Sequence, residues 1–156
     1  MSHPYYVYVA SSWRNPVHAD VCAALRSAGI DHYDFKNPAA GTGFSWRQVK
    51  TDVESVTEPG IKPKGTDWEH VDEYLRMVAH PAAVAGFRAD FEAMQRADTF
   101  VMVLPCGKSA HLELGWAVGA GKRTAILLED PVEPELMYRM VDYMTRSLVE
   151  LLAWLR

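Results

Sequence analysis

The chain has 156 residues, 49% of them hydrophobic, and a formal net charge of −4. This length fits one domain with a sizeable core, and no segment approaches the length of a membrane span. The acidic balance argues against nucleic acid as a partner. The first residues, MSHPYYVYVA, lack a signal-peptide pattern, and the two cysteines form no disulfide or metal pattern, so we expect a reducing, cytoplasmic setting and no membrane partner.

The beginning of the chain predicts a strand, a loop, a helix and a second strand. The apolar run YYVYVA (5–10) is typical of a buried strand. After the loop SSWRN, Asn15 is the predicted cap of a helix with Pro16 at its first position, and Gly29 stands where that helix ends. IDHYDF (30–35) indicates a weaker second strand.

Residues 36–65 differ in character from the rest of the chain. They are rich in Gly, Pro and polar residues, with Phe44 and Trp46 among them, and we expect a long connection. Long connections inside compact domains are often lids or binding loops. The two aromatic rings can stack on a base or form a small core under the loop, and the sequence leaves both open.

The remainder alternates helices and strands. The predicted elements are a helix over 67–78 with a Thr66–Glu69 capping box, a helix from Pro81 to Ala97, a strand over 99–105, a helix over 112–121, a strand over 123–129, a helical stretch over 134–141, a short strand over 142–145, and a last helix after a Ser147–Glu150 capping box. Five strands separated by helices predict an α/β fold with a parallel sheet covered on both faces. The pattern does not set the strand order.

The stretch CGKSAHLELGWAVGAGK (106–122) invites three chemical interpretations. A phosphate loop is excluded, because the first glycine that must precede Gly107-Lys108-Ser109 falls on Met102, inside a strand. A nucleophilic Cys106 is disfavoured, since a cysteine at the end of a buried strand is usually inert packing. A carboxylate site fits better, because ligands of open α/β sheets sit beyond the carboxyl ends of the strands.

The candidates for that carboxylate chemistry are Glu113 and, as a second acid, Asp90, Glu92 or Asp98. Glu113 is expected in about the first turn of the helix after the 99–105 strand, where it either faces the cleft or only complements the helix dipole. Asp90 lies in the 81–97 helix and is either solvated or directed into a site. Asp98 directly precedes the strand and is expected to close the turn.

Three segments resemble the nucleoside 2-deoxyribosyltransferase family and its 2′-deoxynucleoside 5′-monophosphate N-glycosidase relatives. They are YVYVASSW, DFEAMQRADTFVMVLP and SAHLELGWAVGAGKRTAILL, and together they cover about half of the chain. The resemblance implies a flavodoxin-like, Rossmann-like three-layer sandwich with a five-stranded parallel sheet. It also implies a single domain over 1–156, in which the segment at about 36–80 is atypical of the family.

The resemblance also implies an activity and a set of site residues. Glu113 corresponds to the nucleophilic glutamate, Asp90 to the aspartate that handles the base, and Tyr8 to the tyrosine that orients the glutamate. Two carboxyl groups suit the cleavage of an N-glycosidic bond, because one can capture C1′ while the other protonates the leaving base. The expected substrate-binding residues, including Ser109 for a 5′-phosphate, are Ser109, Gly107, Ser11, Arg14, Phe44 and Trp46.

The expected function is therefore cleavage of the N-glycosidic bond of a nucleoside or nucleoside 5′-monophosphate, with transfer to another base or to water. No cofactor and no metal site are expected. The alternatives are a non-catalytic nucleotide sensor on the same scaffold and an interaction protein without a small-molecule site. Relatives of this kind form homodimers or larger oligomers, and the apolar tail SLVELLAWLR either serves that contact or packs on its own sheet.

Overall fold

The computed structural model describes residues 5–38, 44–54, 71–130 and 133–156. They belong to two compact units, one of residues 1–36 and 93–156 and one of residues 37–92, and each is described by itself. In the described ranges no helix is long and apolar enough to cross a membrane. The single domain over 1–156 and its atypical segment at about 36–80 stay predictions.

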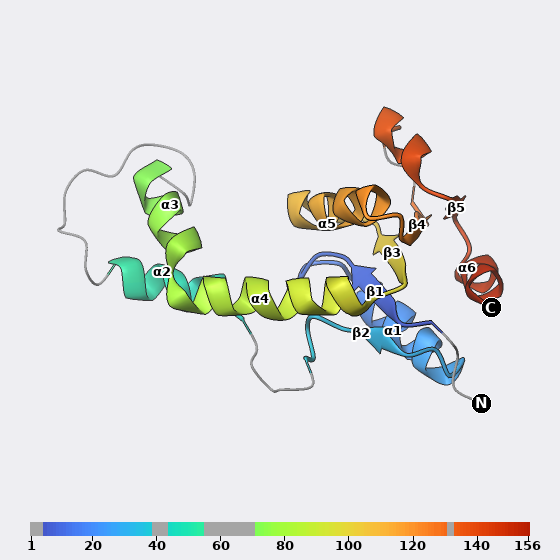
Figure 1. The fold of residues 1–156 in the computed structure, drawn as a ribbon, viewed down its shortest axis with the longest axis horizontal. Helices are drawn as coiled ribbons and strands as arrows, with labels where there is room; N and C mark the ends of the chain where they lie inside the picture. The colour runs from blue at the N-terminus through green and yellow to red at the C-terminus, as the bar shows by residue number, and fades with distance from the viewer. Residues whose placement is uncertain (1–4, 39–43, 55–70, 131–132) are drawn as a thin grey trace. The chain divides into compact units, whose positions relative to one another are not determined.

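The first unit is built on a five-stranded sheet in which every neighbouring pair of strands is parallel (Figure 1). The strands are β1 (Val7–Ala10), β2 (His32–Tyr33), β3 (Thr99–Val103), β4 (Arg123–Leu127) and β5 (Tyr143–Thr145). Their order is β2-β1-β3-β4-β5. The predicted α/β class and the five-stranded parallel sheet are confirmed, and the order is that of flavodoxin-like folds.

Alternate residues of the strands point to opposite faces of the sheet, and each face has its own helices. On one face, Val7, Val9 and Val101 pack in a core with residues of α1 (His18–Ser27) and α6 (Leu148–Leu155). The other face presents Tyr8 and Phe100, and the Phe100 ring lies 6.0 Å from that of Trp116 in α5 (Lys108–Gly119). The tail SLVELLAWLR thus packs on its own sheet through Leu151 and Leu155.

Several predicted boundaries were wrong. The strands at 5–10 and 30–35 are shorter than expected, and β2 has only two residues. The N-cap position of α1 is Val17 and not Asn15, although Asn15 Oδ1 accepts a hydrogen bond from Val17 N at 2.8 Å. Gly29 follows the helix at a φ of 71°, so it ends the helix as predicted.

The second unit contains the helices α2 (Trp46–Glu54), α3 (Val71–Ala79) and most of α4 (Pro81–Arg96). Helix α2 was not predicted, since its region looked like a connection. The Thr66–Glu69 capping box lies outside the described residues. Phe44 packs against α4, because a Cβ atom placed on Gly86 would come within 3.1 Å of the Phe44 ring.

The last part of the chain follows the prediction with one change. Residues 134–141 contain only a short 3₁₀ helix, η1 (Leu136–Met140). One of the two hydrogen bonds of the predicted Ser147–Glu150 capping box is present, because Glu150 N donates to Ser147 Oγ at 3.3 Å. The Glu150 side chain does not complete the box, since it accepts a hydrogen bond from Thr145 Oγ1.

Candidate functional site

The order of the strands places a topological switch point between β1 and β3. From β1 the chain goes to β2 on one side of the sheet, and β3 lies on the other side. Ligands of open α/β sheets bind outside the carboxyl ends of the strands at such a point. The loop after β1 (11–17) and the loop after β3 (104–107) flank it, and both carry residues that the sequence singled out.

Asn15 joins these two loops. Its Nδ2 donates to the carbonyl oxygens of Val103 and Pro105, both at 3.0 Å, and its Oδ1 accepts from Val17 N at 2.8 Å. The side chain is buried, with 4% exposed. Sequence reasoning assigned Asn15 only a capping role, because nothing local in SSWRN indicates partners about 90 residues away.

The loop after β1 also holds two predicted substrate-binding residues. Ser11 directly follows the strand, and its hydroxyl oxygen is buried without a hydrogen-bond partner among the described residues. A buried hydroxyl without a partner lowers stability. Arg14 is exposed, and its backbone N–H donates to Ser12 Oγ at 3.2 Å.

Glu113 lies on the side of α5 that faces the sheet. The buried residues of this helix are Ala110, Leu114 and Ala117, and Glu113 occupies the i+3 position of that stripe. It is half-buried. The helix begins at Lys108, so Glu113 lies in the second turn and not in the first. Its position therefore has little to do with the helix dipole, whose effect falls off within the first turn.

The charge of Glu113 acts on the Cys106 thiol. Burial, together with the nearby Glu113 carboxylate, raises the pKa of Cys106 to about 11. Cys106 is thus a neutral thiol near pH 7, which agrees with the expectation that it is no nucleophile. The same effect places the Glu113 carboxylate close to the loop after β3.

Tyr8 is buried in the middle of β1, with 1% exposed. Its ring stacks on Tyr33 of β2 at 5.4 Å and on Phe100 of β3 at 5.0 Å. Because Phe100 also contacts Trp116, a continuous aromatic layer runs from the sheet to α5 on the face where Glu113 lies. The orienting role of Tyr8 stays a prediction.

An open groove of about 600 Å³ lies at the amino end of α5. It is lined by Cys106, Gly107, Lys108, His111 and Leu112. Gly107 is the residue that precedes the helix, with no side-chain cap among the described residues, and Ser109 is the exposed second residue of the helix. The groove thus combines a lysine with the amino end of a helix, two features that favour an anion.

His111 forms hydrogen bonds that hold the wall of this groove in place. Its Nδ1 lies 2.8 Å from the carbonyl oxygen of Gly107, and its Nε2 lies 2.7 Å from the hydroxyl oxygen of Tyr138. Since a carbonyl only accepts, Nδ1 carries the proton and Nε2 accepts from Tyr138. Both ring nitrogens have partners, so His111 holds the loop after β3 against η1.

The remaining predicted site residues belong to the second unit. Asp90 is a half-buried residue of α4. The rings of Phe44 and Trp46 meet edge to face with centroids 4.8 Å apart. Phe44 packs on Gly86, which supports the interpretation as a small core, whereas Trp46 is 41% exposed. The substrate roles of these residues stay predictions.

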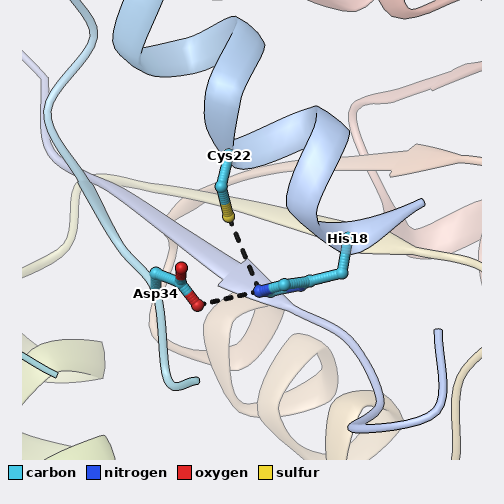
Figure 2. A group of neighbouring side chains, drawn as sticks. All are labelled: His18, Cys22 and Asp34. Carbon is cyan, nitrogen blue, oxygen red and sulfur yellow. Dashed lines mark hydrogen bonds and ion pairs between the residues drawn. The ribbon is translucent and has the colours of Figure 1, made fainter. Parts of the chain in front are cut away.

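A separate cluster of possible metal ligands lies beyond the carboxyl ends of β1 and β2 (Figure 2). His18 Nε2 is 2.9 Å from Asp34 Oδ1 and 3.5 Å from Cys22 Sγ. Burial lowers the pKa of His18 even though the Asp34 carboxylate opposes that shift, and burial raises the pKa of Cys22 to about 12. Sequence reasoning missed this cluster, although the i, i+4 spacing of His18 and Cys22 on one helix was a usable signal.

Comparison with known proteins identifies the fold. No family model and no curated protein matches the sequence. Among solved structures, a 2-deoxyribosyltransferase from Bacillus psychrosaccharolyticus has a TM-score of 0.59 at 15% identity, with 96% of this chain and 95% of that chain covered. A CMP N-glycosidase from Clostridium botulinum has a TM-score of 0.52 at 16% identity, with 96% of each chain covered.

A third structure, a conserved protein from Enterococcus faecalis V583, has a TM-score of 0.55 at 14% identity and covers 97% of this chain and 96% of its own. The predicted resemblance is therefore confirmed at the level of the fold. The chain has the α/β fold of the nucleoside 2-deoxyribosyltransferase family.

Proposed function

We propose that this protein cleaves the N-glycosidic bond of a nucleoside or nucleoside 5′-monophosphate, with Glu113 as the nucleophile. The observation that carries the proposal is the position of Glu113, a half-buried carboxylate on the sheet-facing stripe of the helix that follows β3. A charged residue rarely occupies such a stripe without a function, because an apolar side chain packs there at lower cost. Two enzymes of the same fold act on glycosidic bonds of this kind, which supports the assignment.

The proposed reaction has two displacement steps. In the first, a carboxylate oxygen of Glu113 forms a bond to C1′, the bond from C1′ to the base nitrogen breaks, and its electron pair leaves with the base. A general acid protonates the departing nitrogen. In the second step, a nitrogen of another base or a water oxygen attacks C1′ and releases the Glu113 carboxylate, and the proton of the attacking group returns to the acid. The first acceptor makes the protein a transferase and the second a hydrolase.

The acid of this scheme is Asp90, and Tyr8 orients Glu113, on the strength of the sequence resemblance. Each has a separate test. Asp90→Asn removes the proton donor, so we expect slow release of ordinary bases and much smaller losses with bases that leave without protonation. Tyr8→Phe keeps the aromatic stacking with Tyr33 and Phe100 and removes only the hydroxyl, so a loss of activity in this variant with unchanged stability supports the orienting role.

The groove at the amino end of α5 supports a phosphorylated substrate. Lys108 supplies a positive charge there, and the first backbone N–H groups of the helix point out of its end. Ser109 and Gly107 lie at the same place, and the buried hydroxyl of Ser11 and the exposed Arg14 follow β1 on the other side of the switch point. These residues are the proposed ligands of the sugar and its 5′-phosphate.

The test is a base-release assay with purified protein. Deoxy- and ribonucleosides and their 5′-monophosphates are incubated with and without a second free base, and products are separated by chromatography. Glu113→Gln has nearly the same shape without the charge, and we expect it to lose on the order of 10⁴-fold or more in rate, as removal of a nucleophile does. Glu92→Gln, at an exposed position of α4, is the matched control and is expected to keep full activity.

A second measurement addresses the covalent step directly. Acid quenching during turnover, followed by proteolysis and mass spectrometry, is expected to show a sugar adduct on the peptide that contains Glu113. Base release that persists in Glu113→Gln contradicts the nucleophile assignment. Tight binding of a nucleotide without any base release in the whole panel favours the alternative, a nucleotide sensor on this scaffold.

A further inference from the structure

The cluster of His18, Cys22 and Asp34 lies apart from Glu113 and has no part in the proposed reaction. His18 and Cys22 are one turn apart on α1, and Asp34 follows β2 at the neighbouring carboxyl end. His18 and Cys22 are buried, and the Asp34 side chain is 11% exposed. Figure 2 shows Cys22 Sγ and Asp34 Oδ1 both directed toward His18 Nε2. Their ligand atoms all lie within 4.8 Å of one another.

A hydrogen bond between His18 and Asp34 does not account for the whole arrangement. A neutral imidazole has one N–H and one acceptor nitrogen. His18 Nε2 faces both Asp34 Oδ1 and Cys22 Sγ, so one nitrogen meets two electron-rich atoms. Nδ1 is buried and has no hydrogen-bond partner in the described part of the chain. A nitrogen, a sulfur and a carboxylate oxygen gathered in this way can bind a cation together once the protons of the thiol and of Nε2 are displaced.

Two of the three ligand-atom separations can be compared with those of a tetrahedral transition-metal site. Zinc binds sulfur at about 2.3 Å and imidazole nitrogen at about 2.0–2.1 Å, so the two ligand atoms of a tetrahedron are about 3.5 Å apart. The observed separation of Cys22 Sγ and His18 Nε2 is 3.5 Å. The corresponding nitrogen–oxygen separation in a tetrahedral site is about 3.3 Å. The observed 2.9 Å between His18 Nε2 and Asp34 Oδ1 therefore requires a shift of a few tenths of an ångström.

The chemistry of the ligands selects the kind of metal. Metal binding displaces the proton of the Cys22 thiol to solvent. The resulting thiolate and the Asp34 carboxylate together neutralise a divalent cation, so the loaded cluster carries no net charge and tolerates burial. Nitrogen and sulfur donors favour zinc and related transition metals over magnesium and calcium, which prefer oxygen.

We propose that His18, Cys22 and Asp34 form a binding site for a divalent transition metal ion such as zinc. Three protein ligands leave one position for water. The metal would fix the first turn of α1 to the residue that follows β2, and so would hold the loop that carries Trp13 and Arg14. When Nε2 binds the metal, the ring proton moves to Nδ1, which lacks an acceptor among the described residues. The expected affinity is therefore lower than that of a closed four-ligand zinc site.

Cobalt is the probe that tests this proposal, because its absorption reports the ligands. The full chain is stripped with a chelator, dialysed and titrated with Co²⁺, and the visible and near-ultraviolet spectrum is recorded. We expect saturation at one equivalent, with the absorption of a four-coordinate site and a thiolate-to-cobalt charge-transfer band. Zn²⁺ is then expected to displace the cobalt and abolish both bands.

Two cysteine variants give a matched comparison, since the chain has only Cys22 and Cys106. Cys106→Ser is expected to bind cobalt as the wild type does. Cys22→Ser is expected to lose the charge-transfer band and to bind at least about 10-fold more weakly. Circular dichroism checks the fold of each variant. Asp34→Asn keeps a hydrogen-bond acceptor for His18 and serves as a second variant if Cys22→Ser does not fold, with the same expected weakening.

The possible results separate the proposal from a purely structural cluster. A wild-type protein that shows no saturable band overturns the proposal, and so does a charge-transfer band that survives in Cys22→Ser or disappears in Cys106→Ser. In each of those cases His18, Cys22 and Asp34 are a packed hydrogen-bonded group. One equivalent bound in the wild type and in Cys106→Ser, with weaker binding in Asp34→Asn or Cys22→Ser, supports the metal site.

Discussion

Replacement of Asn15 by alanine tests whether this residue holds the two loops of the candidate site together. The change removes two hydrogen bonds to the carbonyl oxygens of Val103 and Pro105 and one from Val17 N. A protein hydrogen bond contributes about 0.5–1.5 kcal/mol net, and buried groups left without a partner cost more. We therefore expect Asn15→Ala to lower the free energy of unfolding by about 2–4 kcal/mol.

Urea unfolding followed by circular dichroism measures this loss, with the slope m expected to stay unchanged. Ser12→Ala is the control, because it lies in the same loop and loses only the exposed bond from Arg14 N. Its effect is expected to stay within about 0.5 kcal/mol. Asn15→Asp keeps the acceptor for Val17 but turns an oxygen toward two carbonyl oxygens, so at neutral pH it is expected to be at least as destabilised as Asn15→Ala.

The expected effect on function follows from the same geometry. The loop after β1 carries Ser11 and Arg14, and the loop after β3 carries Gly107. If Asn15 sets their separation, kcat/KM for base release falls in Asn15→Ala at temperatures where the protein remains folded. If Asn15→Ala is as stable as Ser12→Ala, the hydrogen bonds of Asn15 do not stabilise the fold as argued. If Asn15→Ala is much less stable but fully active, Asn15 does not set the separation of the two loops for catalysis.

Three further predictions concern α5 and α4. Glu113→Gln is expected to lower the pKa of the Cys106 thiol from about 11. Alkylation of Cys106 by iodoacetamide then becomes faster at a given pH. An unchanged alkylation rate means that the Glu113 carboxylate does not lie near Cys106. Gly115→Ala is expected to raise the free energy of unfolding by about 0.5–1 kcal/mol, because no described atom lies within 4 Å of the new Cβ. Gly86→Ala is expected to raise the free energy of unfolding by less than Gly115→Ala does, or to lower it, because its new Cβ meets the Phe44 ring at 3.1 Å. Equal increases for the two variants in urea unfolding contradict the packing of Phe44 on Gly86.

The sheet could be predicted from the sequence because its strands are short apolar runs between helices. TFVMV and RTAIL are buried almost throughout, as strands of a sheet covered on both faces must be. The strand order could not be predicted, since it depends on which runs pair and not on any run by itself. β2 has only His32 and Tyr33, so local propensity says little about its limits.

The helix starts at the site show where local rules fail. Asn15 before Pro16 has the pattern of a helix cap. Its buried side-chain NH₂ group instead donates to two carbonyl groups about 90 residues away. Helix α5 begins after Gly107, which offers no side chain for a cap. The sequence rule looks for a capping side chain, so it placed Glu113 one turn too close to the start of the helix.

The direction of the polar groups at the switch point favours an anionic substrate. The carbonyl oxygens of Val103 and Pro105 accept from Asn15, and that of Gly107 accepts from His111. Two of the carbonyl groups of the loop after β3, those of Pro105 and Gly107, are thus turned toward protein partners. The N–H groups at the start of α5 have no side-chain cap among the described residues and remain beside the groove that Lys108 lines. Backbone N–H groups at a helix start and a lysine beside them favour a phosphate over a neutral hydroxyl. The 5′-monophosphates should therefore exceed the corresponding nucleosides in kcat/KM, and Lys108→Met should narrow that difference with little effect on the nucleosides.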